Sequence, residues 1–167
     1  VEGGEASLDD EEYCALVAAL APHVGGVDVE IRRDGSSALI EDAHAAGALV
    51  IGSFHDFEGT PSDDQLAEVL ADMNYAGADV LKFACMAHSA TDAARVLGAQ
   101  AWAREAYDRP VIGIAMGPNG APTRLVGSAL GSAATFATLP GAEGSAPGQF
   151  TIEQARAVLD IVEGSEA

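Results

Sequence analysis

The stretch TPSDDQLAEVLADMNYAGADVLKFACMA, residues 60–87, combines an amphipathic helix with the apolar segment that follows it directly. Ser62 suits the N-cap of a helix over 60–77, and Gly77 suits its end. The segment 78–87 is apolar almost throughout, which is typical of a strand covered on both faces. A helix that leads straight into such a strand is the repeating unit of a parallel sheet with helical crossovers.

The same alternation continues on both sides of this stretch. Strands are predicted over 27–32, 48–57, 109–117 and 133–139, and helices over 7–25, 36–47, 91–107, 123–131 and 151–164. The segment 141–149 has no periodicity and is rich in small residues, which fits either a surface connection or a lid over an active site. We therefore expect a single α/β domain over 1–167.

The composition limits the partners of this 167-residue chain. It has 26 acidic residues against 8 basic ones and a formal net charge of -18. Such a surface repels nucleic acid and anionic membranes, so neither is expected as a partner. Acidic residues spread along the chain, together with a single lysine, predict a cytoplasmic protein of a salt-rich cell, because salt screens the repulsion between the carboxylates. Cys14 and Cys85 are expected to be buried thiols in a reducing compartment.

Lys82 lies between Leu81 and Phe83 in the segment 78–87 and is the only lysine in the chain. A lysine at a strand end can simply extend its ammonium into solvent. Arginine would carry a surface charge equally well, but it cannot supply a deprotonated amine near neutral pH. A desolvated lysine amine can attack a carbonyl to form a Schiff base. We therefore predict covalent chemistry at Lys82.

His55, in the stretch SFHDF, lies near the end of the predicted strand one βα unit before Lys82. The carboxyl ends of neighbouring parallel strands share one edge of the sheet, so the two side chains are expected to be neighbours. An imidazole beside an imine-forming lysine is a natural general acid and base. A structural histidine is the alternative.

Other polar residues also fall in the later part of a predicted strand or just beyond it, as Lys82 does. Glu30 and Met116 have this position in the strands over 27–32 and 109–117. In a (β/α) barrel the shared edge is where active sites are built, so Glu30 is expected to contact substrate. Arg124 begins a helix after a strand, and it could grip a carboxylate bidentately or be a solvated arginine. The remaining histidines lack metal-ligand spacing, and no metal site is expected.

Several separate segments share their order and spacing with one family. They are EGG at 2–4, SFHDFEGTPS at 53–62, GADVLKFACMAHSATDA at 77–93, IAMGPNGAPTRLVGSALGSAATFA at 114–137 and SAPGQ at 145–149. Together they resemble type I 3-dehydroquinate dehydratase, the Schiff-base enzyme of the shikimate pathway. The resemblance implies a (β/α)8 TIM barrel and the dehydration of 3-dehydroquinate to 3-dehydroshikimate, with neither metal nor cofactor.

The resemblance also implies a role for each matching residue. Lys82 matches the imine-forming lysine, His55 the general acid and base, and Glu2 the carboxylate that orients the histidine. The matching substrate-binding residues are Arg124 on the substrate carboxylate, Met116 in the pocket, and Ser145 and Gln149 on a closing loop. Family members are often dimeric, so a homodimer is a further expectation.

The chain is shorter than the family's barrel. It is expected to cover about the last six βα units and to lack the first strand, first helix and second strand. Exposed strand edges and an unsupported Glu2 would leave the chain alone with weak activity or none. Two other interpretations remain open, namely another lysine-imine lyase of the class I aldolase type and a truncated, non-catalytic barrel.

Overall fold

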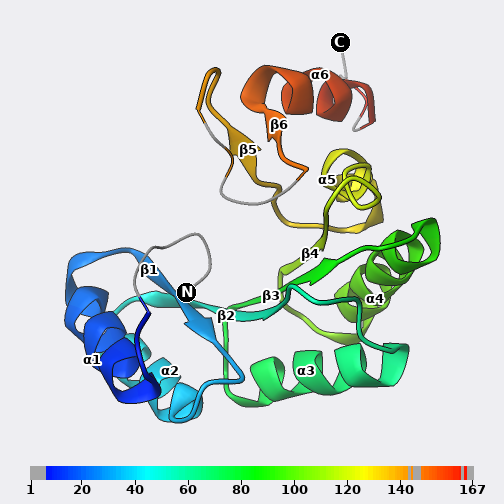
Figure 1. Cartoon of the computed structure of the whole chain (residues 1–167). Coiled ribbons are helices and arrows are strands. Elements are labelled where there is room, and N and C mark those ends of the chain that lie inside the picture. Colours follow the sequence, from blue (N-terminus) through cyan, green and yellow to red (C-terminus); the bar gives the residue numbers. More distant parts are fainter. Residues whose placement is uncertain (1–6, 143, 145–147, 163, 165–167) are drawn as a thin grey trace.

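The computed structural model describes residues 7–142, 144, 148–162 and 164. Figure 1 shows a twisted sheet with helices packed along its outer side, while the C-terminal elements lie on the other side. Glu2 and Ser145 fall outside the described residues, so their predicted positions are not seen.

The main sheet has four strands in the order β1 (Gly26–Glu30), β2 (Leu49–Asp56), β3 (Val80–Met86) and β4 (Val111–Met116). The helices of this part are α1 (Asp10–Leu20), α2 (Ser36–Ala45), α3 (Asp63–Tyr75) and α4 (Ala90–Ala106), with a 3-10 turn over Ala21–His23. All neighbouring strands pair in parallel. The predicted α/β fold with a parallel sheet is thus confirmed.

The C-terminal part is less regular than predicted. It contains α5 (Thr123–Val126), the 3-10 helix η2 (Ser128–Leu130), β5 (Ala137–Thr138), β6 (Phe150–Thr151) and α6 (Ile152–Val162). The strand expected over 133–139 shrinks to β5, which pairs with β6 in a separate two-stranded sheet. Next to its predicted start, Ser132 forms an isolated bridge with Val111 of the main sheet, and the Ala133 amide donates to the Val111 carbonyl at 2.8 Å. Within the described residues the main sheet therefore ends at β4 and does not close.

Local chemistry explains where α3 begins and ends. Ser62 accepts a hydrogen bond from the Gln65 amide, and the Gln65 side chain accepts one from the Ser62 amide, which is a complete capping box. The chain leaves the helix through Gly77 at φ 88°, a left-handed conformation that favours glycine. The predicted cap and stop of this helix are confirmed.

No helix of the described segments combines the length and apolarity that a bilayer span requires.

The two faces of the main sheet differ in chemistry. The face toward the helices carries fully buried apolar side chains, namely Val29, Val50, Leu81, Phe83 and Val111. Side chains alternate along a strand, so the neighbouring positions Asp28, Glu30, Ser53, His55 and Lys82 point to the opposite face. Only β4 is buried at every position. β3 is apolar on both faces apart from Lys82, as expected, whereas β1 and β2 carry several polar side chains on the face away from the helices.

The two cysteines differ in burial. Cys85 lies in the core, and burial raises the pKa of its thiol to about 12. Cys14 is only partly buried, which corrects the expectation of two buried thiols. Burial, followed by the nearby Asp10 carboxylate, also raises the pKa of Cys14.

Gln100 links the main sheet to the C-terminal part. Its side chain is fully buried on α4. Its Oε1 accepts from the Gly113 amide at 2.9 Å, and its Nε2 donates to the carbonyls of Gly127 and Leu130 at 3.0 and 3.2 Å. A side chain on Gly113 would collide with this amide, since a Cβ there would lie 2.8 Å from Oε1. Gln100 thus anchors η2 against β4.

We predict that Gln100→Met destabilises the protein by about 2 kcal/mol or more, because it leaves a buried amide and two carbonyls without this partner. Glu105→Met, at an exposed position of the same helix, is the matched control and should change little. Urea unfolding of both variants tests this. Equal stability of the two variants would contradict it.

Asp79 ties the strands together at the edge of the sheet where β3 begins. Its carboxylate accepts from the Val50 amide at 2.8 Å and lies 2.9 Å from His44 Nε2. Burial alone would raise the pKa of Asp79, but the hydrogen bonds from Val50 and His44 outweigh it and leave the pKa below its ordinary value.

This lowered pKa makes the contribution of Asp79 depend on pH. The stabilisation is complete above the ordinary pKa of 3.8 and is lost as the pH falls through the lower folded value. Asp79→Asn should therefore cost about 1 kcal/mol at pH 7, and its difference from the wild type should shrink in acid. Urea unfolding at pH 7 and near pH 3 measures both. Asp72→Asn, which breaks a half-exposed ion pair with Arg32, should cost less. A difference that grows in acid would refute the assignment.

Candidate active site

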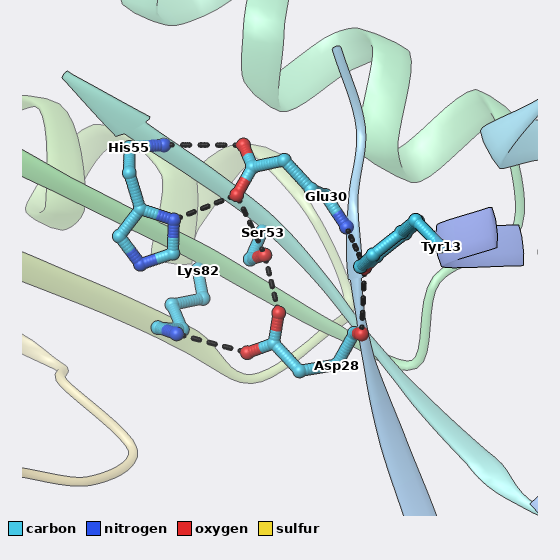
Figure 2. A network of polar contacts seen from close by, with 6 residues as sticks. All are labelled: Tyr13, Asp28, Glu30, Ser53, His55 and Lys82. Atoms are coloured by element: carbon cyan, nitrogen blue, oxygen red, sulfur yellow. Dashed lines mark hydrogen bonds and ion pairs between the residues drawn. The ribbon is translucent and has the colours of Figure 1, made fainter. Parts of the chain in front are cut away.

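Parallel pairing places three site residues in one row across the sheet. Glu30 is the register partner of Ser53, and Ser53 is the register partner of Lys82. Residues in register on parallel strands project to the same face, and so do residues two positions away. Asp28 and His55 therefore share this face with the row. Figure 2 shows the polar side chains converging there.

Lys82 forms an ion pair with a residue two strands away. It is the third residue of β3, so the expectation that it lies in the later part of its strand is wrong. Its side chain is 12% exposed, and its Nζ donates to Asp28 Oδ2 at 2.8 Å. The ammonium also lies 5.5 Å from the centre of the Phe136 ring, a cation–π distance. The amine is thus largely withdrawn from solvent and ion-paired.

Glu30 holds His55 at two points. Glu30 Oε2 lies 2.7 Å from His55 Nδ1, and Oε1 accepts from the His55 amide at 3.2 Å. The His55 side chain is only 8% exposed, and its ring stacks on Phe57 with the centroids 6.1 Å apart. A carboxylate on Nδ1 fixes the tautomer and orientation of the imidazole. The family resemblance implies this role for Glu2, which lies outside the described residues; within them, Glu30 makes these contacts with His55.

Ser53 joins the two halves of the site. Its hydroxyl contacts Asp28 Oδ1 at short range and Glu30 Oε2 at 3.3 Å, and the residue is fully buried. Lys82, Asp28, Ser53, Glu30 and His55 therefore form one continuous hydrogen-bonded network (Figure 2). Figure 2 makes clear that this network crosses three strands.

Tyr13 of α1 supports the network from the side of β1 that faces away from β2. Its hydroxyl donates to the Asp28 carbonyl at 3.1 Å and accepts from the Glu30 amide at 3.0 Å. These backbone groups belong to the edge strand β1, where a further strand would otherwise pair with them. Burial, and to a lesser extent the Asp28 and Glu30 carboxylates, raises the pKa of Tyr13. Tyr13 thus fixes the strand that carries both carboxylates.

Sequence analysis did not identify Asp28, Ser53 or Tyr13. The signal for the first two was the spacing of two residues in Asp28–Glu30 and Ser53–His55, which puts each pair on one face of a strand. Tyr13 reaches the site from a helix, and no local pattern indicates that contact.

The structure brings Met116 to the site face and buries Arg124 on α5. Met116 is 2% exposed and is clustered with Ile112, Ile114 and Ala84 beside the polar network. Arg124 is 5% exposed on α5, and burial lowers the pKa of its guanidinium. It lines a cavity of about 190 Å³ whose other lining residues include neither Lys82 nor His55.

The predicted closing loop is only partly described. Gln149 is half-buried, and a Cβ on its neighbour Gly148 would lie 2.8 Å from the Gly117 carbonyl. The end of SAPGQ therefore lies against the chain just after β4, near Met116. Among the described residues, no three His, Cys, Asp or Glu side chains gather to form a metal site.

The site combines the Lys82 amine, which is shielded from solvent and ion-paired to Asp28, with the His55 imidazole, which Glu30 orients. This set can form an imine and move protons around it.

The chain is similar to known proteins over nearly its whole length. It is 42% identical to 3-dehydroquinate dehydratase of Klebsiella pneumoniae over an alignment 166 residues long, which covers 96% of this chain and 65% of that protein. The Listeria welshimeri enzyme of the same name is 39% identical over 165 residues, with the same coverage. The chain thus spans about 65% of the length of these relatives.

Solved structures agree with these relatives. The 3-dehydroquinate dehydratase of Geobacillus kaustophilus matches with a TM-score of 0.90 and 34% identity, covering 99% of this chain and 65% of that one. The type I enzyme of Clostridium difficile, solved with covalently modified comenic acid, matches with a TM-score of 0.87 and 32% identity, covering 98% of this chain and 66% of that one. The model of the type I 3-dehydroquinase family matches residues 1–166. The chain belongs to the type I 3-dehydroquinase family.

Proposed function

We propose that this chain carries the imine-forming site of a 3-dehydroquinate dehydratase, a hydro-lyase that converts 3-dehydroquinate to 3-dehydroshikimate. The observation that carries the proposal is the joint placement of Lys82 and His55 on one face of the sheet. Lys82 is ion-paired to Asp28, and His55 is held by Glu30. Family membership supplies the substrate.

The proposed chemistry begins at Lys82. Its neutral amine attacks the ketone carbon to give a carbinolamine, and the protonated hydroxyl then leaves as water, which gives an iminium. Removing a proton next to a ketone is difficult, because the carbanion has little stabilisation in water. The iminium accepts the electron pair, so His55 can take the proton and then return it to the departing hydroxyl as water leaves. Glu30 on Nδ1 aims the proton transfers through Nε2.

Substrate binding is proposed for residues around the end of β4. Arg124 would clamp the substrate carboxylate bidentately through its planar guanidinium. Met116 would line the pocket beside the ring, and Gln149 and Ser145 would close over it. Glu30 is proposed to contact substrate in addition to holding His55.

We also propose that the four-stranded sheet is an arc of a (β/α)8 barrel, with this chain as one domain supplying about the last six βα units. Its polar face would then be the barrel interior. The similarity to longer relatives over 65% of their length supports this. The net charge of -18 with a single lysine supports a salt-rich cytoplasm. A homodimer is the proposed assembly.

The first test is trapping of the imine in high salt. Incubation with 3-dehydroquinate and sodium cyanoborohydride should give one stable adduct, which peptide mapping locates on the peptide with Lys82. Lys82→Met is the control that should abolish it. An adduct formed with an aldolase substrate instead would favour another lysine-imine lyase. No adduct with either would favour a non-catalytic barrel.

The role of His55 is tested by the mass of the trapped species. In His55→Gln the imine should still form, but dehydration should slow by about 10²-fold or more for lack of the general acid and base. The trapped adduct should then be heavier by one water than the dehydrated adduct of the wild type. His88→Gln, an exposed histidine, is the matched control. Equal fractions of dehydrated adduct in His55→Gln and wild type would remove His55 from the mechanism.

A further inference from the structure

The contact between Lys82 and Asp28 spans more of the sheet than a neighbouring ion pair would need. The two residues belong to β3 and β1, which are separated by β2. Neighbouring strands lie about 4.8 Å apart, so the lysine side chain extends over Ser53 to bring Nζ within 2.8 Å of Asp28 Oδ2. The ammonium is thus directed at this carboxylate along the sheet face.

The Asp28 carboxylate is held from both ends. Oδ2 receives the Lys82 ammonium, and Oδ1 receives the Ser53 hydroxyl. The backbone carbonyl of Asp28 is bound by Tyr13. A carboxylate fixed in this way needs little reorganisation to exchange a proton with the amine.

We propose that Asp28 is a further catalytic residue that accepts and returns the proton of Lys82 during imine formation, with Ser53 as its positioning residue. The inference rests on the proposed imine at Lys82. An ammonium has no lone pair, so one proton must leave before nitrogen can attack a carbonyl. Asp28 Oδ2 lies at hydrogen-bond distance to receive it.

The step balances without any outside reagent. The ammonium gives one proton to Asp28, and the neutral amine bonds to the ketone carbon. A second nitrogen-bound hydrogen moves to the former carbonyl oxygen, giving a carbinolamine. Asp28 returns its proton to that hydroxyl, the C–O bond breaks, and water leaves. The products are an iminium on Lys82 and an ionised Asp28, which then serves as its counter-ion.

The surrounding groups support separate roles for Asp28 and His55. Glu30 is engaged with His55, and Tyr13 faces the backbone of β1. On the far side of β3, β4 presents only apolar side chains to this face, namely Ile112, Ile114 and Met116. Asp28 thus serves imine formation, while His55 is reserved for the dehydration.

Ser53 can adapt to both protonation states of Asp28. A hydroxyl has one proton to donate, and Ser53 contacts one oxygen of Asp28 and one of Glu30. When Asp28 is ionised, the hydroxyl donates to it. When Asp28 holds the proton from Lys82, the hydroxyl can turn toward Glu30.

The test measures how fast Lys82 forms an imine at pH 7, with cyanoborohydride as the trap and two ketones as probes. One is 3-dehydroquinate, and the other is cyclohexanone, which lacks its carboxylate and hydroxyls. Since Lys82 is the only lysine, the peptide that contains it reports the reaction directly. Trapping of cyclohexanone without 3-dehydroquinate would overturn the proposed function but still decide the role of Asp28.

Asp28→Ala should slow trapping of both ketones by about 10²-fold, the usual contribution of a general acid and base. Sodium formate should restore part of the rate, because it can occupy the vacated space as a carboxylate, while equal sodium chloride should not. Ser53→Ala should slow trapping by a smaller factor, without response to formate. Asp72→Ala is the matched control, since it also removes a carboxylate from an ion pair, and it should react as the wild type does.

The outcomes separate catalysis from charge alone. If Asp28 only stabilised the ammonium, Asp28→Ala would react as fast as the wild type or faster, and formate would slow it; either result overturns the proposal. Absence of formate rescue in a variant whose circular dichroism matches the wild type also overturns it. If the wild type traps neither ketone, Lys82 is not a nucleophile and both proposals fall.

Discussion

The parallel register of β1, β2 and β3 is the constraint on which the rest of the structure depends. It places Glu30, Ser53 and Lys82 in one row and turns their side chains to the same face. A shift of one residue in any of these pairings would send the side chains of that strand to the helix side. Burial of Val29, Val50 and Leu81 on the helix side prevents such a shift. The hydrophobic core therefore specifies the geometry of the site.

The site also depends on support for β1 from a helix. β1 is the first strand of the sheet in the described residues, and its outward backbone groups at Asp28 and Glu30 are bound by the Tyr13 hydroxyl. An edge strand is prone to fraying and to unwanted pairing. A tyrosine from α1 that engages both groups keeps the two carboxylates of β1 in place. A helix thus supports the first described strand of the sheet through two backbone hydrogen bonds.

The ionisable side chains of the site pair across strands. Lys82 is paired with Asp28 and His55 with Glu30, and both carboxylates come from one strand. The basic groups come from the two strands that follow. Paired ionisable groups that are largely withdrawn from solvent stabilise one another only when their geometry is fixed. The Ser53 hydroxyl fixes it by contacting both carboxylates.

The sequence by itself determined the elements with strong local signals and the residues with unusual chemistry. Ser62 and Gly77 marked the limits of α3 because capping and a left-handed turn are local properties. Lys82 stood out as the only lysine. Tertiary structure alone decided that β5 is two residues long, and that Asp28 rather than a strand-end group meets Lys82. Those outcomes depend on which strands pair and how far a side chain reaches across them, and neither is encoded in a local pattern.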